Sequence, residues 1–336
     1  MSLFGVRRHP VIAQLSAGVQ LPGFDGATGW LNSPPLTPAG LRGNVVLVDF
    51  WTYTCINWLR TLAYVRAWAE RYEDQGLVVV GVHTPEFPFE RDIDNVRPAA
   101  EAMRVDYPIA LDSDYAIWSA FDNMYWPAVY ITDAEGRIRY HHFGEGEYDE
   151  CEWVIQRLLR DAGGEGVGDD LVSVVPDGFE AQADWTNLRS PETYLGYDQG
   201  QNFASPEGAE LEEARDYAAP DSLRLNHWAL SGDWTIESRA SVLNRADGRI
   251  VFRFHARDVH LVMAPRPRDT SVPFRVLVDG EPPGDAHGID TDEQGRGTVE
   301  QPRLYQLIRE RGSTKDRTFE ITFLAPGVEA YVFTFG

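Results

Sequence analysis

One cysteine in this sequence stands where it could act as a nucleophile. Cys55 follows the stretch VDFWTYT and precedes a stretch with helical periodicity, so it lies at the junction of a predicted buried strand and a predicted helix. The N–H groups and the dipole at a helix start favour a thiolate, and thiols in such positions ionise below their ordinary value of about 8.5. A thiolate is the reactive form in thiol–disulfide exchange and in peroxide reduction. The sequence predicts a reactive or formerly reactive thiol at Cys55, the alternative being a small buried apolar residue.

Other residues are weaker candidates for chemistry. Cys151 could resolve a bond formed at Cys55 only if the two Cα atoms lay within roughly 7 Å, and we interpret it as structural. His83 and Glu86 follow a predicted strand at its C-terminal end, the edge where open α/β sheets bind ligands. Glu86 could move a proton in exchange chemistry, or both residues could be solvated parts of a loop. No cluster has zinc spacing and no glycine motif fits a phosphate, so we predict neither metal nor cofactor.

The elements around Cys55 form a strand–helix–strand unit. Asn44–Phe50 and Leu77–His83 are Val-rich apolar runs of the kind buried in parallel sheets. Between them, Cys55–Tyr72 carries the apolar stripe of an amphipathic helix, and Gly76 marks its end. Such a unit has a right-handed crossover. The same region is predicted to contain a helical stretch interrupted near Pro98 (Phe89–Met103), two strands joined as a hairpin (Ala128–Thr132 and Arg137–Phe143) and a last helix (Asp149–Asp161).

The pattern changes after the glycine-rich run Gly163–Gly168. Short strand-like runs separated by Gly, Pro and Asp turns replace the alternation of strands and helices, which indicates an all-β sandwich or jelly roll. We predict a first domain over residues 1–162, a linker and connecting segment over 163–190, and a β-sandwich over 191–336. The strands predicted there are Leu223–Leu230, Trp234–Glu237, Arg249–Ala256, Val259–Met263, Phe274–Asp279, Arg303–Ile308, Thr318–Leu324 and Glu329–Phe335.

The composition limits the partners. The chain has 336 residues, with 52 Asp and Glu against 30 Lys and Arg, a net charge of -22. This charge repels phosphate backbones and anionic lipid surfaces, so we expect neither nucleic acid nor membrane as a partner. Residues 1–21 make a poor signal peptide, and two cysteines make no disulfide framework. We therefore expect a reducing, cytoplasmic location, or an extracytoplasmic one if a leader precedes this sequence.

Two motifs around the cysteine carry a resemblance to a known family. Asp49-Phe-Trp51 precedes Cys55, and Trp126-Pro127 opens the strand Ala128–Thr132. On these motifs, residues 22–160 resemble the thioredoxin-like proteins of the TlpA and redoxin group, and the whole chain resembles the soluble C-terminal portion of DipZ-type thiol–disulfide proteins. The resemblance implies a thioredoxin fold in which Asp49 is a buried carboxylate that helps to move protons. It also implies that Pro127 is a cis-proline lying against the active-site sulfur, with Trp126 beside the bound substrate.

One departure from the family motif decides which reactions remain open. Cys-x-x-Cys reads Cys55-Ile-Asn-Trp58 here, so the cysteine that resolves a mixed disulfide in this family is a tryptophan. Cys55 could work as a monothiol on a thiol or disulfide substrate, with a small thiol as the resolving partner. It could instead be a one-cysteine peroxidase, which Thr52 suggests weakly, or the fold could be an inactive scaffold that binds a protein or a glycan. A Trp58 ring that covers Cys55 would favour the scaffold, and a ring packed inward would favour the enzyme.

The second region also carries a resemblance. From about Glu192, the segments LNHWALSGDW, RFHARDVHLVM and GVEAYVFTFG resemble the carbohydrate-binding-like module that follows the thioredoxin domain in DipZ-type proteins. A sugar site needs aromatic platforms beside polar groups. Trp228, Trp234 and Tyr197 are the candidates for such platforms, the alternative being that they pack in the core of the sandwich.

Overall fold

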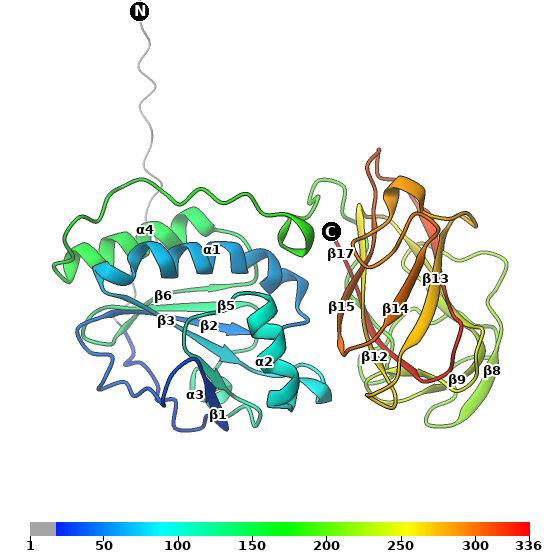
Figure 1. Cartoon of the computed structure of the whole chain (residues 1–336), viewed down its shortest axis with the longest axis horizontal. Coiled ribbons are helices and arrows are strands. Elements are labelled where there is room, and N and C mark those ends of the chain that lie inside the picture. The colour runs from blue at the N-terminus through cyan, green and yellow to red at the C-terminus, as the bar shows by residue number, and fades with distance from the viewer. Residues whose placement is uncertain (1–17) are drawn as a thin grey trace, which may run out of the picture. The chain divides into compact units, whose positions relative to one another are not determined.

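The structure, a computed structural model, describes residues 18–336. The chain divides into two compact units, one ending at Pro176 and the other beginning at Asp177 (Figure 1). This division falls inside the segment 163–190 that the sequence predicts as the connection. The prediction about a signal peptide concerns residues 1–21, of which 1–17 lie outside the described residues. Among the described residues, no helix combines the length and the apolar character needed to cross a membrane.

The first unit is built on a six-stranded sheet with the strand order β1-β4-β3-β2-β5-β6. Its strands are β1 (Gly29–Leu31), β2 (Val45–Trp51), β3 (Leu77–His83), β4 (Ile109–Leu111), β5 (Ala128–Thr132) and β6 (Ile138–Phe143). The central strands β2, β3 and β4 run parallel, and the other three pair antiparallel with their neighbours. Every residue of β2 is buried, which explains why its sequence, apart from Asp49, is apolar throughout rather than alternating.

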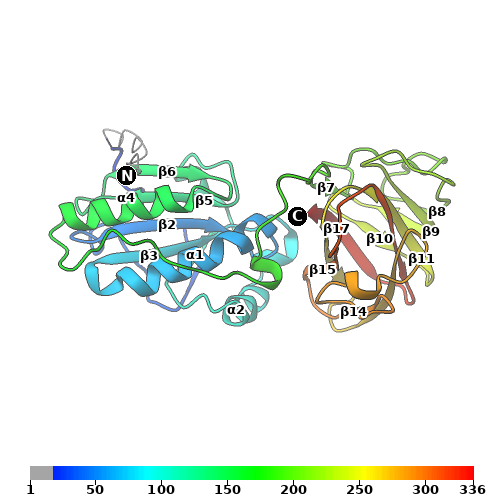
Figure 2. The same ribbon diagram turned by 90° about the horizontal axis from the view of Figure 1, so that it is seen from above.

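Helices cover both faces of this sheet. They are α1 (Ile56–Tyr72), α2 (Ile93–Ala102), α3 (Ala116–Ala120) and α4 (Tyr148–Asp161), with 3-10 turns at Glu73–Gln75 and Pro88–Arg91. Figure 2 shows α1 and α4 side by side along one face. On the other face, Val46, Val48 and Phe50 of β2 pack with Phe121 just after α3. Because side chains alternate along a strand, Asp49 and Trp51 point to the α1 side.

The helical stretch before β4 differs from its prediction. The sequence predicts an interruption near Pro98, but Pro98 lies inside the continuous helix α2. The interruption is at Asp92 instead, between the 3-10 turn and α2. The Asp92 carboxylate accepts a hydrogen bond from the Asp94 N–H at 3.0 Å, which caps the new helix.

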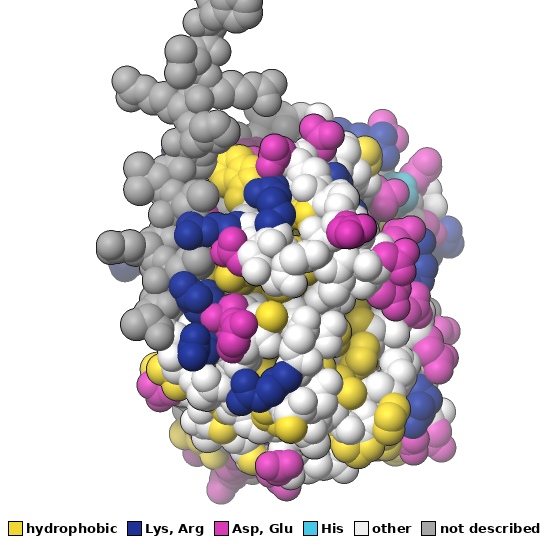
Figure 3. Space-filling view, turned by 90° about the vertical axis from the view of Figure 1, so that its left-hand side faces the viewer, with side chains coloured by type: hydrophobic (Ala, Val, Ile, Leu, Met, Phe, Trp, Pro, Cys, Tyr) yellow, Lys and Arg dark blue, Asp and Glu magenta, His cyan; other side chains and the backbone are white. Residues whose placement is uncertain are grey.

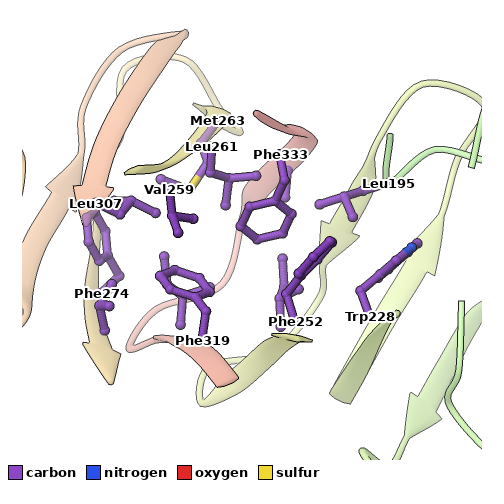
Figure 4. Close-up of a cluster of buried hydrophobic side chains, with 14 of the residues drawn as sticks. Leu195, Trp228, Phe252, Val259, Leu261, Met263, Phe274, Leu307, Phe319 and Phe333 are labelled. Carbon is purple, nitrogen blue, oxygen red and sulfur yellow. The ribbon is translucent and has the colours of Figure 1, made fainter. Parts of the chain in front are cut away.

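The second unit is an antiparallel sheet that encloses its own core. Its path runs β14-β13-β16-β11-β9-β10-β17-β12-β15, with β7 paired to β17 and β8 to β9. In Figure 4, Phe252, Phe319 and Phe333 lie close together within this core. The strands are β7 (Thr193–Tyr194), β8 (Ala214–Tyr217), β9 (Trp228–Ile236), β10 (Ser241–Leu243), β11 (Gly248–Phe254), β12 (Asp258–Pro265), β13 (Val272–Val278), β14 (Arg296–Val299), β15 (Arg303–Arg309), β16 (Arg317–Phe323) and β17 (Val328–Phe335), with 3-10 turns at Gly178–Glu180 and Gly284–Ala286.

Strand β9 corrects another prediction. The sequence predicts two strands, Leu223–Leu230 and Trp234–Glu237, whereas the structure has the single strand β9. Gly232 lies inside it at φ 94°, a conformation that glycine adopts without the steric cost of a Cβ. Before this glycine β9 pairs with β11, and after it with β10. The glycine therefore marks a change of partner within one strand rather than a turn between two.

The charged side chains are intermixed on the face drawn in Figure 3. Basic side chains lie next to aspartate and glutamate there, with hydrophobic patches between them. Although the net charge is -22, this face thus presents both signs.

Candidate active site around Cys55

Cys55 is the N-cap residue of α1, directly before its first residue Ile56. Its carbonyl accepts the first helical hydrogen bond from Leu59 N–H at 3.0 Å, and its own N–H donates to the Thr52 carbonyl at 3.2 Å. The residue is partly exposed. The first turn of α1 holds no acidic residue, so no carboxylate there opposes a negative charge on the sulfur.

The loop before β5 lies against this sulfur. The Trp126–Pro127 peptide bond is cis, and the Trp126 carbonyl oxygen lies 3.9 Å from Cys55 Sγ. The Trp126 indole N–H donates to the Thr84 carbonyl at 3.1 Å, and its ring lies 4.2 Å from that of Trp118. The Pro127 carbonyl accepts from Gly144 N–H at 2.8 Å. The structure therefore brings Trp126 and Pro127 together with Cys55, at the carboxyl ends of the parallel strands.

Trp58 packs inward rather than over the sulfur. Its side chain is fully buried, and its indole N–H donates to Asp49 Oδ2 at 2.9 Å. The Trp58 ring stacks on that of Trp51, with centroids 4.3 Å apart. Trp58, at the position of the resolving cysteine, therefore donates a hydrogen bond to the buried carboxyl group of Asp49, and Cys55 itself is a partly exposed residue.

Asp49 is a buried carboxyl group in the middle of the sheet. Burial raises its pKa to about 7, against the smaller opposing effects of hydrogen bonds from Trp58 and Tyr107. The Tyr107 hydroxyl lies 3.4 Å from Asp49 Oδ2. Asp49 therefore changes its charge near neutral pH instead of staying ionised as an exposed aspartate does.

His83 is buried and not a solvated loop residue. It ends β3, and its ring meets that of Trp51 edge to face at 4.8 Å and stacks on Tyr53 at 5.8 Å. Burial lowers the pKa of His83 to about 3, so the imidazole is neutral at physiological pH.

The buried carboxylate after β3 belongs to Glu90, a residue that sequence reasoning missed. Glu90 Oε2 accepts hydrogen bonds from the N–H groups of Glu86 and Phe87, and Oε1 accepts from the Thr54 hydroxyl at 2.6 Å. Glu90 thus ties the residue before Cys55 to the loop that contains Glu86. The predicted candidate Glu86 is half-buried and contributes its backbone to this network.

Cys151 differs from Cys55 in its surroundings. Its side chain is 2% exposed, and burial raises the pKa of its thiol to about 12. A thiol in this environment does not ionise near neutral pH, so it supplies no nucleophile there.

The structure contradicts two of the three aromatic candidates in the second unit. Trp228 and Trp234 are 2% and 0% exposed and belong to the core. Their indole N–H groups donate to the backbone carbonyls of Gln201 and Ser231. Neither ring therefore presents a face to a sugar. Tyr197 remains exposed.

No group of three or more His, Cys, Asp and Glu side chains within residues 18–336 is arranged to hold a metal ion. The buried carboxyl groups of the first unit accept hydrogen bonds from neighbouring side chains: Asp49 from the Trp58 indole N–H, and Glu90 from the Thr54 hydroxyl.

Comparison with known proteins identifies the family. Residues 18–141 match the AhpC/TSA family, and residues 190–336 match the thioredoxin like C-terminal domain. The thiol-disulfide oxidoreductase YkuV of Bacillus subtilis is 30% identical over 139 residues, which cover 41% of this chain and 93% of YkuV. Protein DipZ of Mycobacterium tuberculosis is 40% identical over 255 residues, or 75% of this chain. The chain belongs to the thioredoxin-like proteins of the DipZ type.

The matched region spans only 36% of the length of DipZ. A solved structure described as a thioredoxin-like protein in the oxidized form is 29% identical and covers 44% of this chain and 99% of its own, with a TM-score of 0.41.

The protonation of Asp49 predicts a pH dependence of stability. The pKa of Asp49 is raised from 3.8 to about 7 on folding, so between these values the folded chain holds a proton that the unfolded chain has lost. The contribution of Asp49 to stability therefore falls as the pH rises from about 4 to 7. Asp49→Asn, which stays neutral, should gain up to about 4 kcal/mol relative to the parent between pH 4 and pH 8.

Urea unfolding of both proteins at pH 4, 6 and 8 measures this difference. Asp94→Asn, which removes an exposed carboxylate of α2, is the control and should follow the parent at every pH. A difference between Asp49→Asn and the parent that does not grow with pH would contradict a neutral Asp49 in the folded state.

Proposed function

We propose that this protein is a thiol–disulfide oxidoreductase that works as a monothiol through Cys55. The observation that carries the proposal is the direction of Trp58: the ring is buried and bonded to Asp49, while Cys55 is a partly exposed residue whose sulfur lies 3.9 Å from the Trp126 carbonyl oxygen. The 30% sequence identity to YkuV, a protein named as a thiol-disulfide oxidoreductase, supports the same class of reaction.

The reaction needs one nucleophile and an external resolving thiol. The Cys55 thiolate attacks one sulfur of a substrate disulfide, so that a new S–S bond forms, the old one breaks, and the other substrate sulfur leaves as a thiolate. A small thiol then attacks the mixed disulfide as its thiolate, and Cys55 is released. Trp126 and Pro127 line the position of the substrate chain, and a reducing compartment would supply the small thiol.

The jelly-roll assignment of the second unit remains a proposal. The antiparallel strand path and the shared aromatic core support it. With Trp228 and Trp234 buried, we do not propose a glycan as the ligand of this unit.

Selective alkylation tests the reactivity of Cys55. Native protein treated with iodoacetamide should gain one adduct by intact mass, because Cys55 is partly exposed and the Cys151 thiol is buried with a raised pKa. Denatured protein should gain two adducts. The alkylation rate should reach half its plateau at a pH below 8.5, because thiols at the start of a helix have pKa values of about 3.5–7.5.

Two matched variants assign the site. Cys55→Ser should gain no adduct in the native state, and Cys151→Ser should behave like the parent. Oxidised glutathione should then form a mixed disulfide at Cys55. A slow, unshifted alkylation would contradict the enzyme and favour the scaffold, and faster reaction with hydrogen peroxide than with disulfides would favour the peroxidase.

Restoring the second cysteine tests the chemistry of position 58. In Trp58→Cys the new thiol stands one helical turn after Cys55, at the position from which residue 58 contacts Asp49. We expect oxidised glutathione to give a disulfide between Cys55 and the introduced thiol, seen as the loss of two hydrogens in the intact mass, and the variant to gain insulin reduction by dithiothreitol. The lost ring should cost about 3–5 kcal/mol of stability.

Trp58→Phe is the control, since it also removes the indole hydrogen bond but adds no thiol. It should gain no insulin reduction. If Trp58→Cys folds and keeps both thiols in oxidised glutathione, position 58 is not arranged for a dithiol centre.

A further inference from the structure

A cavity of about 730 Å³ opens on the first unit between the last turns of α1, the start of β3 and the segment before β4. Charged side chains line it, among them Arg66, Glu70, Glu73 and Arg104. Glu70, Glu73 and Arg104 are exposed, so the cavity is open to solvent. Its volume is many times the roughly 30 Å³ that a water molecule occupies in the liquid, so it has room for water.

Tyr107 forms the inner wall of this cavity. Its side chain is 8% exposed, and its hydroxyl reaches Asp49 Oδ2 at 3.4 Å. Asn32 fixes the segment, because its side-chain amide donates to the carbonyls of Val105 at 2.7 Å and Tyr107 at 3.1 Å. Tyr107 thus both lines the cavity and contacts the buried carboxyl group.

Gly81 provides the space for this arrangement. A Cβ at Gly81 would lie 2.8 Å from Trp51 Nε1, which is too close for a side chain, and 3.0 Å from Tyr107 Cε2, which is a very tight contact. A glycine inside a buried strand often marks such an approach of another group. The glycine in the apolar run LVVVGVH is the sequence signal for the contact, although it does not say which residue makes it.

The other polar neighbour of Asp49 cannot pass a proton. Trp58 is fully buried, and an indole N–H donates a hydrogen bond but accepts none. A phenol hydroxyl both donates and accepts. Tyr107 and Trp58 both contact Asp49 Oδ2. Among the described residues, the other carboxyl oxygen, Oδ1, has no hydrogen-bond partner.

We propose that the Tyr107 hydroxyl carries protons between Asp49 and water in this cavity. When Asp49 is protonated, an O–H bond forms at Oδ2 as the O–H bond of Tyr107 breaks, and the phenol oxygen takes a proton from a hydronium ion in the cavity. Deprotonation reverses each step. Charge and atoms balance, and nothing is oxidised or reduced.

The surrounding charges are consistent with this role. Arg66 acts electrostatically on Tyr107 from α1, and on the β3 side His83 is neutral. Burial, and then the charge of Asp49, raise the pKa of Tyr107 well above its ordinary value, so that it stays a phenol across the range in which Asp49 titrates. Tyr107 is a positioning residue in this scheme, and its action does not depend on whether Cys55 is reactive.

The indole N–H signal of Trp58 gives a direct test. This proton points at Asp49, so its chemical shift in 15N-tryptophan-labelled full-length protein follows the charge of that carboxyl group, and Trp58→Phe assigns the signal. In the parent we expect one averaged peak that moves with a midpoint near pH 7. In Tyr107→Phe the midpoint should move upward, because a stabilising hydrogen bond is lost, and two separate peaks should replace the averaged one.

Two further variants make the test decisive. Tyr72→Phe is the control, because it removes a different buried hydroxyl, one that donates to the Glu152 carboxylate. Its Trp58 signal should show the same averaged peak and the same midpoint as in the parent. Ala69→Phe narrows the cavity from α1 without touching Asp49, and should give separate peaks at an unshifted midpoint. An averaged peak in folded Tyr107→Phe, or in Ala69→Phe, would overturn the proposal.

Discussion

The hydrogen bond from Trp58 to Asp49 is the interaction on which the site depends. A carboxyl group in the middle of a buried sheet needs a donor, because an unpaired buried polar group is costly. Trp58 supplies that donor and fills the space between α1 and the sheet by stacking on Trp51. This draws the side chain at position 58 inward, while Cys55 is partly exposed and its sulfur lies 3.9 Å from the Trp126 carbonyl oxygen. In this chain, the partner that donates a hydrogen bond to Asp49 is therefore a tryptophan, which stands at the second cysteine position of the Cys-x-x-Cys motif.

Two buried titratable groups near Trp51 act on stability in opposite directions. The raised pKa of Asp49 favours the folded state at low pH, and this contribution is lost as the pH rises from about 4 to 7. The lowered pKa of His83 does the reverse, because the unfolded chain binds a proton below about 6.5 that the buried imidazole rejects until about 3. The two effects offset each other in the range they share. A substitution that removes only Asp49 or only His83 therefore reveals how stability depends on pH through the group that remains.

The two units differ in how far local sequence predicts them. The bounds of β3 and β5 coincide with the predicted runs, because buried strands are rich in β-branched residues and are bounded by turns. Six short strands are absent from the prediction, since two to four residues carry little periodicity and these strands exist only through their pairing: β1, β4, β7, β8, β10 and β14. The longer strands of the second unit are predicted, but the faces of Trp228 and Trp234 are not. An aromatic residue on a strand fits the core and a binding face equally well until its neighbours are known.

The sequence by itself determined that Cys55 lies between a buried strand and a helix, that Trp58 replaces the second cysteine, and that a β-rich unit follows. These are local properties, carried by composition, periodicity and motif. The tertiary structure decided where the Trp58 ring points, which groups meet Asp49, and that Glu90 rather than Glu86 is the buried acid. The physical reason is separation along the chain. Tyr107 and Asp49 are 58 residues apart, and Thr54 and Glu90 are 36 apart, so only the packing of the sheet against its helices and loops brings them into contact.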